Sequence, residues 1–278
     1  SDLLRLVSRS LLEVNIEQEK FENLKEAMVR GLQNNKLGKA YARGGYYSRL
    51  LWLVEQYNED EKLEALRPIT LGQVKAFAKT LYQRVYITGM AHGNWNDDKV
   101  RESINTLLDG IKSKPLPEGE RFTQGVEVLT TGEDFVFSRQ AKDNNNALIY
   151  GLQIGPHSMD LQAQSSLIAS IIESDFYTQM RTNQQLGYIV ASFKQRIEDR
   201  LFIKFIIQSA EYGPFELKRR VEAWLADTEK LLADLTDEEF ERHRDALVVS
   251  LEKEGDSIGE VLGDFYYAVT EEDEDFRY

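Results

Sequence analysis

The feature that most constrains the fold is the pattern from Leu201 to Gln208, in which apolar side chains at every second position alternate with a mixed set. A period of two predicts a β-strand, because successive side chains of a strand point to opposite faces of a sheet. The stretch from Tyr188 to Lys194 predicts an antiparallel partner for it. One face of this hairpin would be apolar and the other mixed, which is typical of a sheet covered on one face. The apolar set is Leu201, Ile203, Phe205 and Ile207, alternating with Phe202, Lys204, Ile206 and Gln208.

Long amphipathic helices are predicted on both sides of this hairpin. One would run from about Met159 to Met180 after Pro156, and another would open at Pro214. An aromatic-rich helix is predicted over residues 46–57. Two more helix starts have the spacing of a capping box, at Thr70–Gln73 and Thr236–Glu239.

Shorter stretches rich in β-branched and aromatic residues predict further strands at residues 84–90, 126–129, 135–138 and 147–154. Strands of this kind combined with long helices indicate the α+β class, with mainly antiparallel sheets covered by helices. Residues 115–124 carry Pro115, Pro117 and Gly119 among charged side chains and therefore predict a linker. The chain would then divide into residues 1–114, the linker 115–124, and residues 125–278.

Charge and cysteine content exclude several classes of protein. The formal net charge of -13 argues against a nucleic-acid partner, because phosphate binding needs a surplus of Lys and Arg. The chain has no cysteine, which excludes disulfides, thiol catalysis and cysteine-based metal sites. No run approaches the roughly 20 apolar residues of a membrane helix, so no membrane partner is expected.

No complete catalytic apparatus is visible in the sequence. The histidines His92, His157 and His243 lie far apart, and neither HExxH nor the inverted HxxEH motif occurs. Glu239 and His243 are four residues apart on one predicted helix and could offer two metal ligands. A surface i,i+4 contact is the favoured interpretation of that pair, because a catalytic zinc site needs three protein ligands. We therefore expect neither a catalytic residue nor a metal ligand here.

A short turn from Arg181 to Tyr188 connects a predicted helix to the hairpin. Gly187 permits a bend there that a Cβ would hinder. The two side chains would stand at the ends of one short turn and could face the same cavity. Arg offers a rigid fork of donors to carbonyl or carboxylate oxygens, and a phenol can donate to a developing oxyanion. From the residues alone, helix-end electrostatics for the Arg and packing for the Tyr remain the favoured alternative.

Several segments, in the same order along the chain, resemble the C-terminal half of the insulinase/pitrilysin-type zinc metallopeptidase family. The most specific is residues 180–188, which resembles the Leu-Arg-Thr-x-x-Gln-Leu-Gly-Tyr segment of that family, with Met180 in place of the leading Leu. The other segments are FENLKE at 21–26, YYSRLL at 46–51, HGN at 92–94, FIIQS at 205–209 and RVEAW at 220–224.

The resemblance implies two domains of insulinase (LuxS-like metalloenzyme) type, both truncated: the back portion of a third domain at 1–114 and most of a fourth at 125–278. Such halves form the wall of a closed chamber, and the zinc with its HxxEH motif lies in the N-terminal half. The resemblance also implies that Arg181 and Tyr188 reach the active site and bind substrate near the scissile bond. The chain alone would then be inactive and hold no zinc.

The implied partners are the N-terminal catalytic half of the same polypeptide and peptide substrates. A non-catalytic scaffold or assembly subunit of the same superfamily is the alternative, although it would have no use for a substrate clamp. The location would be periplasmic for a bacterial pitrilysin-like enzyme and cytoplasmic for an insulinase-like one.

Overall fold

A computed structural model describes residues 2–12, 15–253 and 255–271. The chain divides into two compact units. The first consists of the described residues of Ser1–Gly31, Asp60–Thr123 and Glu254–Tyr278, and the second of Leu32–Glu59 and Gln124–Lys253. The predicted assignment of residues 1–114 and 125–278 to two insulinase-type domains stays a prediction.

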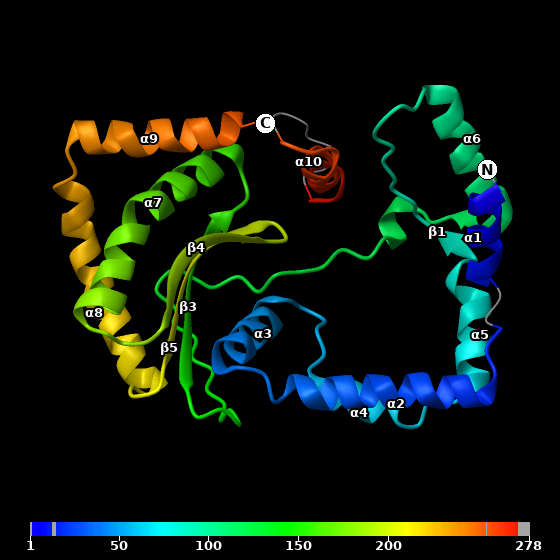
Figure 1. Ribbon diagram of the computed structural model, residues 1–278, viewed down its shortest axis with the longest axis horizontal. Coiled ribbons are helices and arrows are strands. Elements are labelled where there is room, and N and C mark those ends of the chain that lie inside the picture. The colour runs from blue at the N-terminus through cyan, green and yellow to red at the C-terminus, as the bar shows by residue number, and fades with distance from the viewer. Residues whose placement is uncertain (1, 13–14, 254, 272–278) are drawn as a thin grey trace. The chain divides into compact units, whose positions relative to one another are not determined.

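The second unit is built on an antiparallel sheet in the order β3-β5-β4 (Figure 1). Its strands are β3 (Asn146–Pro156), β4 (Ile189–Ile197) and β5 (Arg200–Ser209). In the β4–β5 hairpin Ala191 stands opposite Ile206 and Ile197 opposite Arg200, so the predicted hairpin is confirmed. β3 and β4 are the outer strands of the sheet, and β5 is its central strand.

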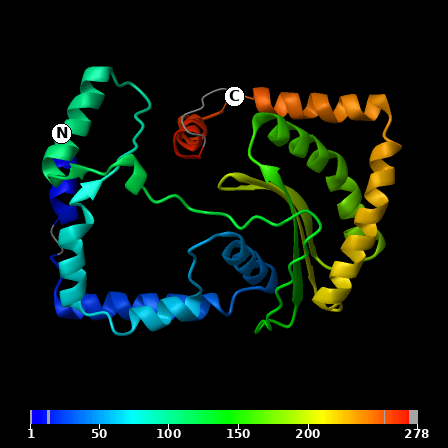
Figure 2. The same ribbon diagram turned by 180° about the vertical axis from the view of Figure 1, so that it is seen from behind.

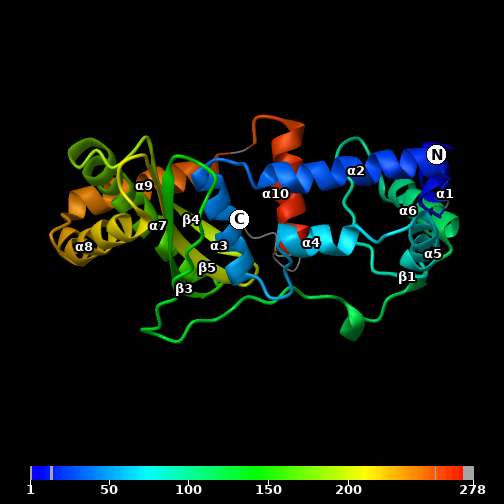
Figure 3. The same cartoon turned by 90° about the horizontal axis from the view of Figure 1, so that it is seen from below.

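Helices cover both faces of this sheet (Figures 1 and 3). Phe205 on β5 packs against Phe176 of α7 (Met159–Tyr177) and Trp224 of α8 (Pro214–Ala233), with ring centroids 4.9 to 5.4 Å apart. The opposite face lies against α3 (Ala40–Trp52), where Trp52 packs on Phe202 at 4.8 Å. The expectation of a sheet covered on one face is therefore wrong. The mixed face can also be covered because α3 offers it a polar partner: Lys204 Nζ donates to Ser48 Oγ at 3.2 Å.

The helix boundaries of this unit follow local sequence signals. The predicted capping box at Thr236 is confirmed, and α9 (Asp237–Glu252) begins there (Figure 2). α7 is capped by Ser158 and continues at its end into a wider π-helical turn, η2 (Thr178–Asn183). The aromatic-rich helix predicted at 46–57 is α3, which begins and ends earlier.

The first unit is mainly helical. Its short parallel pair β1 (Arg84–Val85) and β2 (Lys114–Pro115) lies next to α6 (Asp97–Ile111) in the chain. The capping box at Thr70, which opens α5 (Leu71–Leu81), is confirmed. The remaining elements are α1 (Asp2–Leu12), α2 (Gln18–Asn35, mostly in this unit), α4 (Glu59–Leu66), η1 (Glu118–Glu120) and α10 (Ile258–Glu271).

Three strand predictions are corrected by the structure. The strand predicted at 84–90 is reduced to Arg84–Val85. Residues 126–129 and 135–138, all within the described part, form no strand beyond a single bridge between Leu53 and Val126. For residues 126–129 the reason is that the side chain of Gln153 bonds this backbone, accepting from Leu129 N at 3.0 Å and donating to Glu127 O at 2.8 Å. Within the described residues, no helix combines the length and apolarity needed to cross a bilayer.

Candidate functional site

The turn between α7 and β4 is anchored by two apolar side chains. Met180 and Leu186 are fully buried, and Leu186 N donates to Met180 O at 2.9 Å. The polar residues between them are thereby held at the surface. Gln184 is fixed further by α8, because Arg220 Nη1 donates to its Oε1 at 3.0 Å. Arg220 was not singled out as a site residue from the sequence, although it opens one of the segments that carry the resemblance.

Gly187 is required by a close approach of two backbones. A Cβ built on it would lie 1.8 Å from the carbonyl oxygen of Gln208 at the end of β5. The sequence correctly indicated that a side chain is excluded here. The cause is a steric contact across the hairpin rather than a left-handed bend.

Arg181 and Tyr188 stand together on the surface of this turn. The guanidinium carbon of Arg181 lies 5.5 Å from the centroid of the Tyr188 ring, close enough for a cation–π contact. Tyr188 is 84 % exposed, while Arg181 is half-buried. The structure thus brings together the two residues singled out from the sequence. An exposed phenol is not explained by packing.

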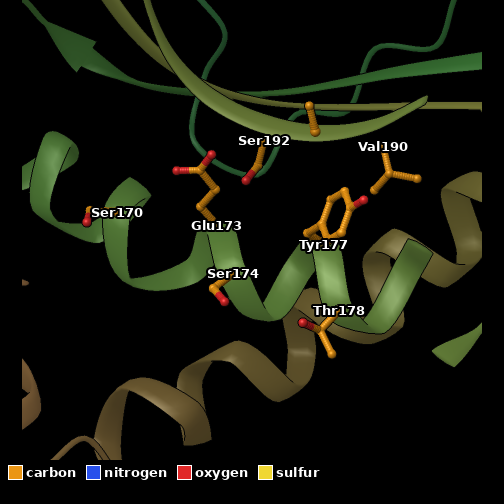
Figure 4. A pocket seen from close by; sticks show the side chains of 8 residues that line it. Ser170, Glu173, Ser174, Tyr177, Thr178, Val190 and Ser192 are labelled. Atoms are coloured by element: carbon orange, nitrogen blue, oxygen red, sulfur yellow. The ribbon is translucent and has the colours of Figure 1, made fainter. Parts of the chain in front are cut away.

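A polar groove with a volume of about 510 Å³ lies beside this turn (Figure 4). In Figure 4, Glu173 and Tyr177 point from α7 toward the strand. Arg181 and Tyr188 are not among its lining residues, so the expectation that both face one cavity does not hold for this groove. This α7–β4 groove is lined by Ser170, Glu173, Ser174, Tyr177 and Thr178 from α7 and by Val190, Ala191 and Ser192 from β4.

The histidines have separate partners. His157 Nε2 lies 2.6 Å from Gln162 Oε1, and His243 Nδ1 lies 3.3 Å from Ser170 Oγ. The carboxylate of Glu239 accepts from the backbone of Thr236, which lowers the pKa of that carboxyl. Glu239 is therefore a helix cap. Among the described residues, no group of three or more His, Cys, Asp or Glu is arranged to hold a metal ion.

Three buried charged groups lie on α3 or contact it. Arg43 pairs with Glu59, donating from Nη2 to Oε2 at 3.1 Å, and also contacts Tyr47. Burial opposes ionisation of Glu59, but the hydrogen bond and charge of Arg43 outweigh it and lower the pKa of the carboxyl. Lys204 is 4 % exposed, and its burial lowers the pKa of the amino group to about 8.

Comparison with known proteins identifies relatives of this chain. Residues 167–265 match the family model described as PQQ synthase PqqF-like, C-terminal lobe domain 4. The chain is 32% identical over 256 residues to insulin-degrading enzyme of Mus musculus, covering 89% of this chain and 25% of that protein. It is 29% identical over 260 residues to a nardilysin-like protein of Arabidopsis thaliana, covering 91% and 25%. The chain therefore spans about a quarter of the length of these relatives.

The fold is shared with solved peptidase structures. The crystal structure of pitrilysin matches with a TM-score of 0.81 at 20% identity, covering 93% of this chain and 27% of that chain. The periplasmic protease PqqL from Escherichia coli matches with a TM-score of 0.63 at 13% identity, covering 97% and 30%. The α+β class and the resemblance predicted from the sequence are thereby confirmed.

Proposed function

Because this chain belongs to the insulinase/pitrilysin family, we infer that it is part of the non-catalytic C-terminal half of a zinc-dependent endopeptidase. In this proposal it forms part of the wall of the chamber in which peptides are hydrolysed. It also contributes substrate-binding residues to an active site whose catalytic residues lie in the N-terminal half of the polypeptide.

The observation that carries the proposal is the pairing of Arg181 with an exposed Tyr188. Met180 and Leu186 anchor the turn in the core, so the two functional side chains start from a rigid base. A positioned pair of donors is useful to a peptidase because the geometry is fixed before substrate arrives. A scaffold without activity would gain nothing from an exposed phenol held over a guanidinium.

Each side chain has a defined chemical role in this proposal. The planar guanidinium of Arg181 donates to a substrate carbonyl or carboxylate and orients the peptide. The hydroxyl of Tyr188 donates to the oxygen on which negative charge develops as the tetrahedral intermediate forms. The contact between the ring and the guanidinium keeps both groups on one side of the turn.

The described residues of this chain do not fit a zinc site, because no three suitable ligands converge among them. In this proposal the zinc of the complete enzyme lies in the N-terminal half, as the resemblance to the insulinase/pitrilysin family implies. No step of the proposed role of Arg181 and Tyr188 requires a metal ligand from this chain.

The test is a comparison of variants in the complete polypeptide that contains this chain. Arg181→Ala and Tyr188→Phe should each lower kcat/KM for a peptide by about 10- to 1000-fold, the range for loss of one oxyanion donor. Arg101→Ala and Tyr57→Phe change exposed residues outside the turn and serve as matched controls. Unchanged kinetics in both turn variants would contradict the proposal. A complete polypeptide without peptidase activity would instead support a scaffold.

A further inference from the structure

The outer edge of β4 is open to a further strand. In the order β3-β5-β4, the described residues place no strand beyond β4. An edge strand presents unpaired backbone N–H and C=O groups, which can pair with an extended peptide. The α7–β4 groove lies along this edge, since its strand residues are Val190, Ala191 and Ser192.

α7 provides the floor of the groove. Its lining residues recur at spacings of three and four, from Ser170 through Ser174 to Thr178, and so share one face of the helix. That face extends for about 12 Å at 1.5 Å per residue. This length matches about three to four residues of extended strand. The floor is polar, unlike the apolar α7 face that packs under the sheet with Phe176 and Met180.

The hydroxyl of Ser192 independently indicates that the groove binds a ligand. Its side chain is only 7 % exposed, it lines the groove, and within the described part of the chain its hydroxyl has no hydrogen-bond partner. A buried polar group without a partner is costly, and few occur in native proteins. In Figure 4 the Ser192 side chain points from β4 into the space that Glu173 also enters.

The charge of the groove indicates what it binds. Glu173 is the one charged side chain among the lining residues, and it is exposed. The nearby charged groups are engaged elsewhere, because Lys194 Nζ donates to Ser166 Oγ at 2.6 Å and Asp175 accepts from Trp224. The negative charge of Glu173 therefore favours a basic side chain in the groove. The net charge of -13 of the chain also attracts basic ligands.

We propose that the α7–β4 groove binds an extended peptide segment that pairs with the free edge of β4 and directs a basic side chain to Glu173. Ser192 supplies a hydrogen bond to the bound segment. The proposal rests on the proposed function, because the groove adjoins the turn of Arg181 and Tyr188 along the chain: Thr178 lies three residues before Arg181, and Tyr188 lies two residues before Val190. The groove is thus a substrate subsite next to the pair.

Fluorescence anisotropy with the 278-residue chain tests strand pairing. The probe is a fluorescein-labelled peptide, Thr-Val-Lys-Val-Thr-Val, and its charge-reversed counterpart carries Glu in place of Lys. Two further versions are N-methylated at alternate residues, because successive N–H groups of a strand point to opposite sides. One methylated version should lose binding and the other should retain it. Equal affinity of both methylated peptides, or no binding of the parent peptide, overturns the proposal.

Protein variants test the groove itself. Glu173→Gln should reduce the preference for the Lys peptide by about 3- to 5-fold, the effect of one exposed ion pair. Asp227→Asn, an exposed acid on α8, is the matched control and should change nothing. Ser192→Ala should weaken binding by about 2- to 10-fold without lowering the melting temperature of the free chain, because its hydroxyl is unpaired there. Unchanged affinity in both groove variants overturns the assignment of the site.

Failure of this subsite is distinguishable from failure of the proposed function. If the peptides do not bind but Arg181→Ala and Tyr188→Phe still slow hydrolysis in the complete polypeptide, only the subsite is wrong. If the peptides bind as expected and those two variants leave hydrolysis unchanged, the groove is a peptide site but the proposed function is wrong.

Discussion

The indole Nε1 of Trp224 donates a hydrogen bond of 2.7 Å to Oδ2 of Asp175. This bond joins α8 to the last turn of α7, where Trp224 also packs on Phe176 and Phe205. The end of α7 leads directly into the turn with Arg181, so the bond fixes the base of the candidate site. Because this hydrogen bond is directional, it also restricts sliding of α7 and α8 along each other.

Trp224→Phe keeps an aromatic ring but leaves the Asp175 carboxylate without its donor. We expect the free energy of unfolding to fall by about 1–3 kcal/mol, the cost of leaving a partly buried carboxylate without its hydrogen-bond donor. Urea denaturation measures it. The exposed Trp95, replaced by Phe, is the control and should change the free energy by less than about 0.5 kcal/mol. An equal effect at both positions would contradict the role of the hydrogen bond.

Gly187→Ala places a Cβ against the backbone of Gln208, where neither atom is at the end of a flexible side chain. The turn must shift, and we expect a loss of about 1–3 kcal/mol in the free energy of unfolding. In contrast, Gly45→Ala in α3 meets no atom within 4 Å and should stabilise by about 0.5–1 kcal/mol. Thermal unfolding of the two variants side by side checks the opposite signs.

Arg43→Met leaves Glu59 buried without its partner, which should cost about 3–5 kcal/mol. The double variant Arg43→Met/Glu59→Leu should recover most of that loss, because no buried charge remains. No recovery would show that the pair contributes through packing alone.

The Arg43–Glu59 pair also predicts that the free energy of unfolding depends on pH. The folded pKa of Glu59 lies below its ordinary value of 4.5, so the unfolded state binds the proton more readily. Its contribution to stability is therefore present above about pH 4.5 and lost as the pH falls through the folded pKa. Denaturation curves between pH 3 and 6 should show this acid loss, and the double variant should lack the part due to Glu59.

Lys204 should give a rise of stability with pH in a second window, at high pH. Its folded pKa of about 8 lies below the ordinary value of 10.5, so between these values the unfolded state binds more protons. Stability then rises with pH in this window, by about 3 kcal/mol. Lys204→Met should remove the rise and stabilise the chain at pH 7. Lys99→Met on the surface of α6 is the control, and an equal slope in both variants would sink this prediction.

Local signals predicted the fold best. The β4–β5 hairpin and the capping boxes at Thr70 and Thr236 each depend on residues within a few positions of one another, and all are confirmed. The missing strand at 126–129 could not be predicted, because Gln153 acts from 24 residues away. The cover provided by α3 over the mixed face depends on contacts 156 residues apart, such as Ser48 with Lys204.

The candidate site was predictable in part. The proximity of Arg181 and Tyr188 follows from a short turn, and the structure places them together. Their role as substrate ligands stays a prediction. The groove was not foreseen, because Ser170 and Ser192 come from separate elements and carry no sequence motif. The steric reason for Gly187 was also hidden, since it involves the end of β5.

The π-helical turn η2 gives α7 a place where chain length can change. A π turn holds more residues than an α turn, so removal of one residue between Thr178 and Asn183 would restore α-helical winding. Because a π turn accommodates its extra residue locally, the segments before and after it would keep their register, and only the residues within the turn would change direction. Insertions and deletions at this turn would therefore re-aim Arg181 while the cores of α7 and β4 keep their packing. We expect single-residue length differences between relatives, where they occur near the site, to fall in this segment.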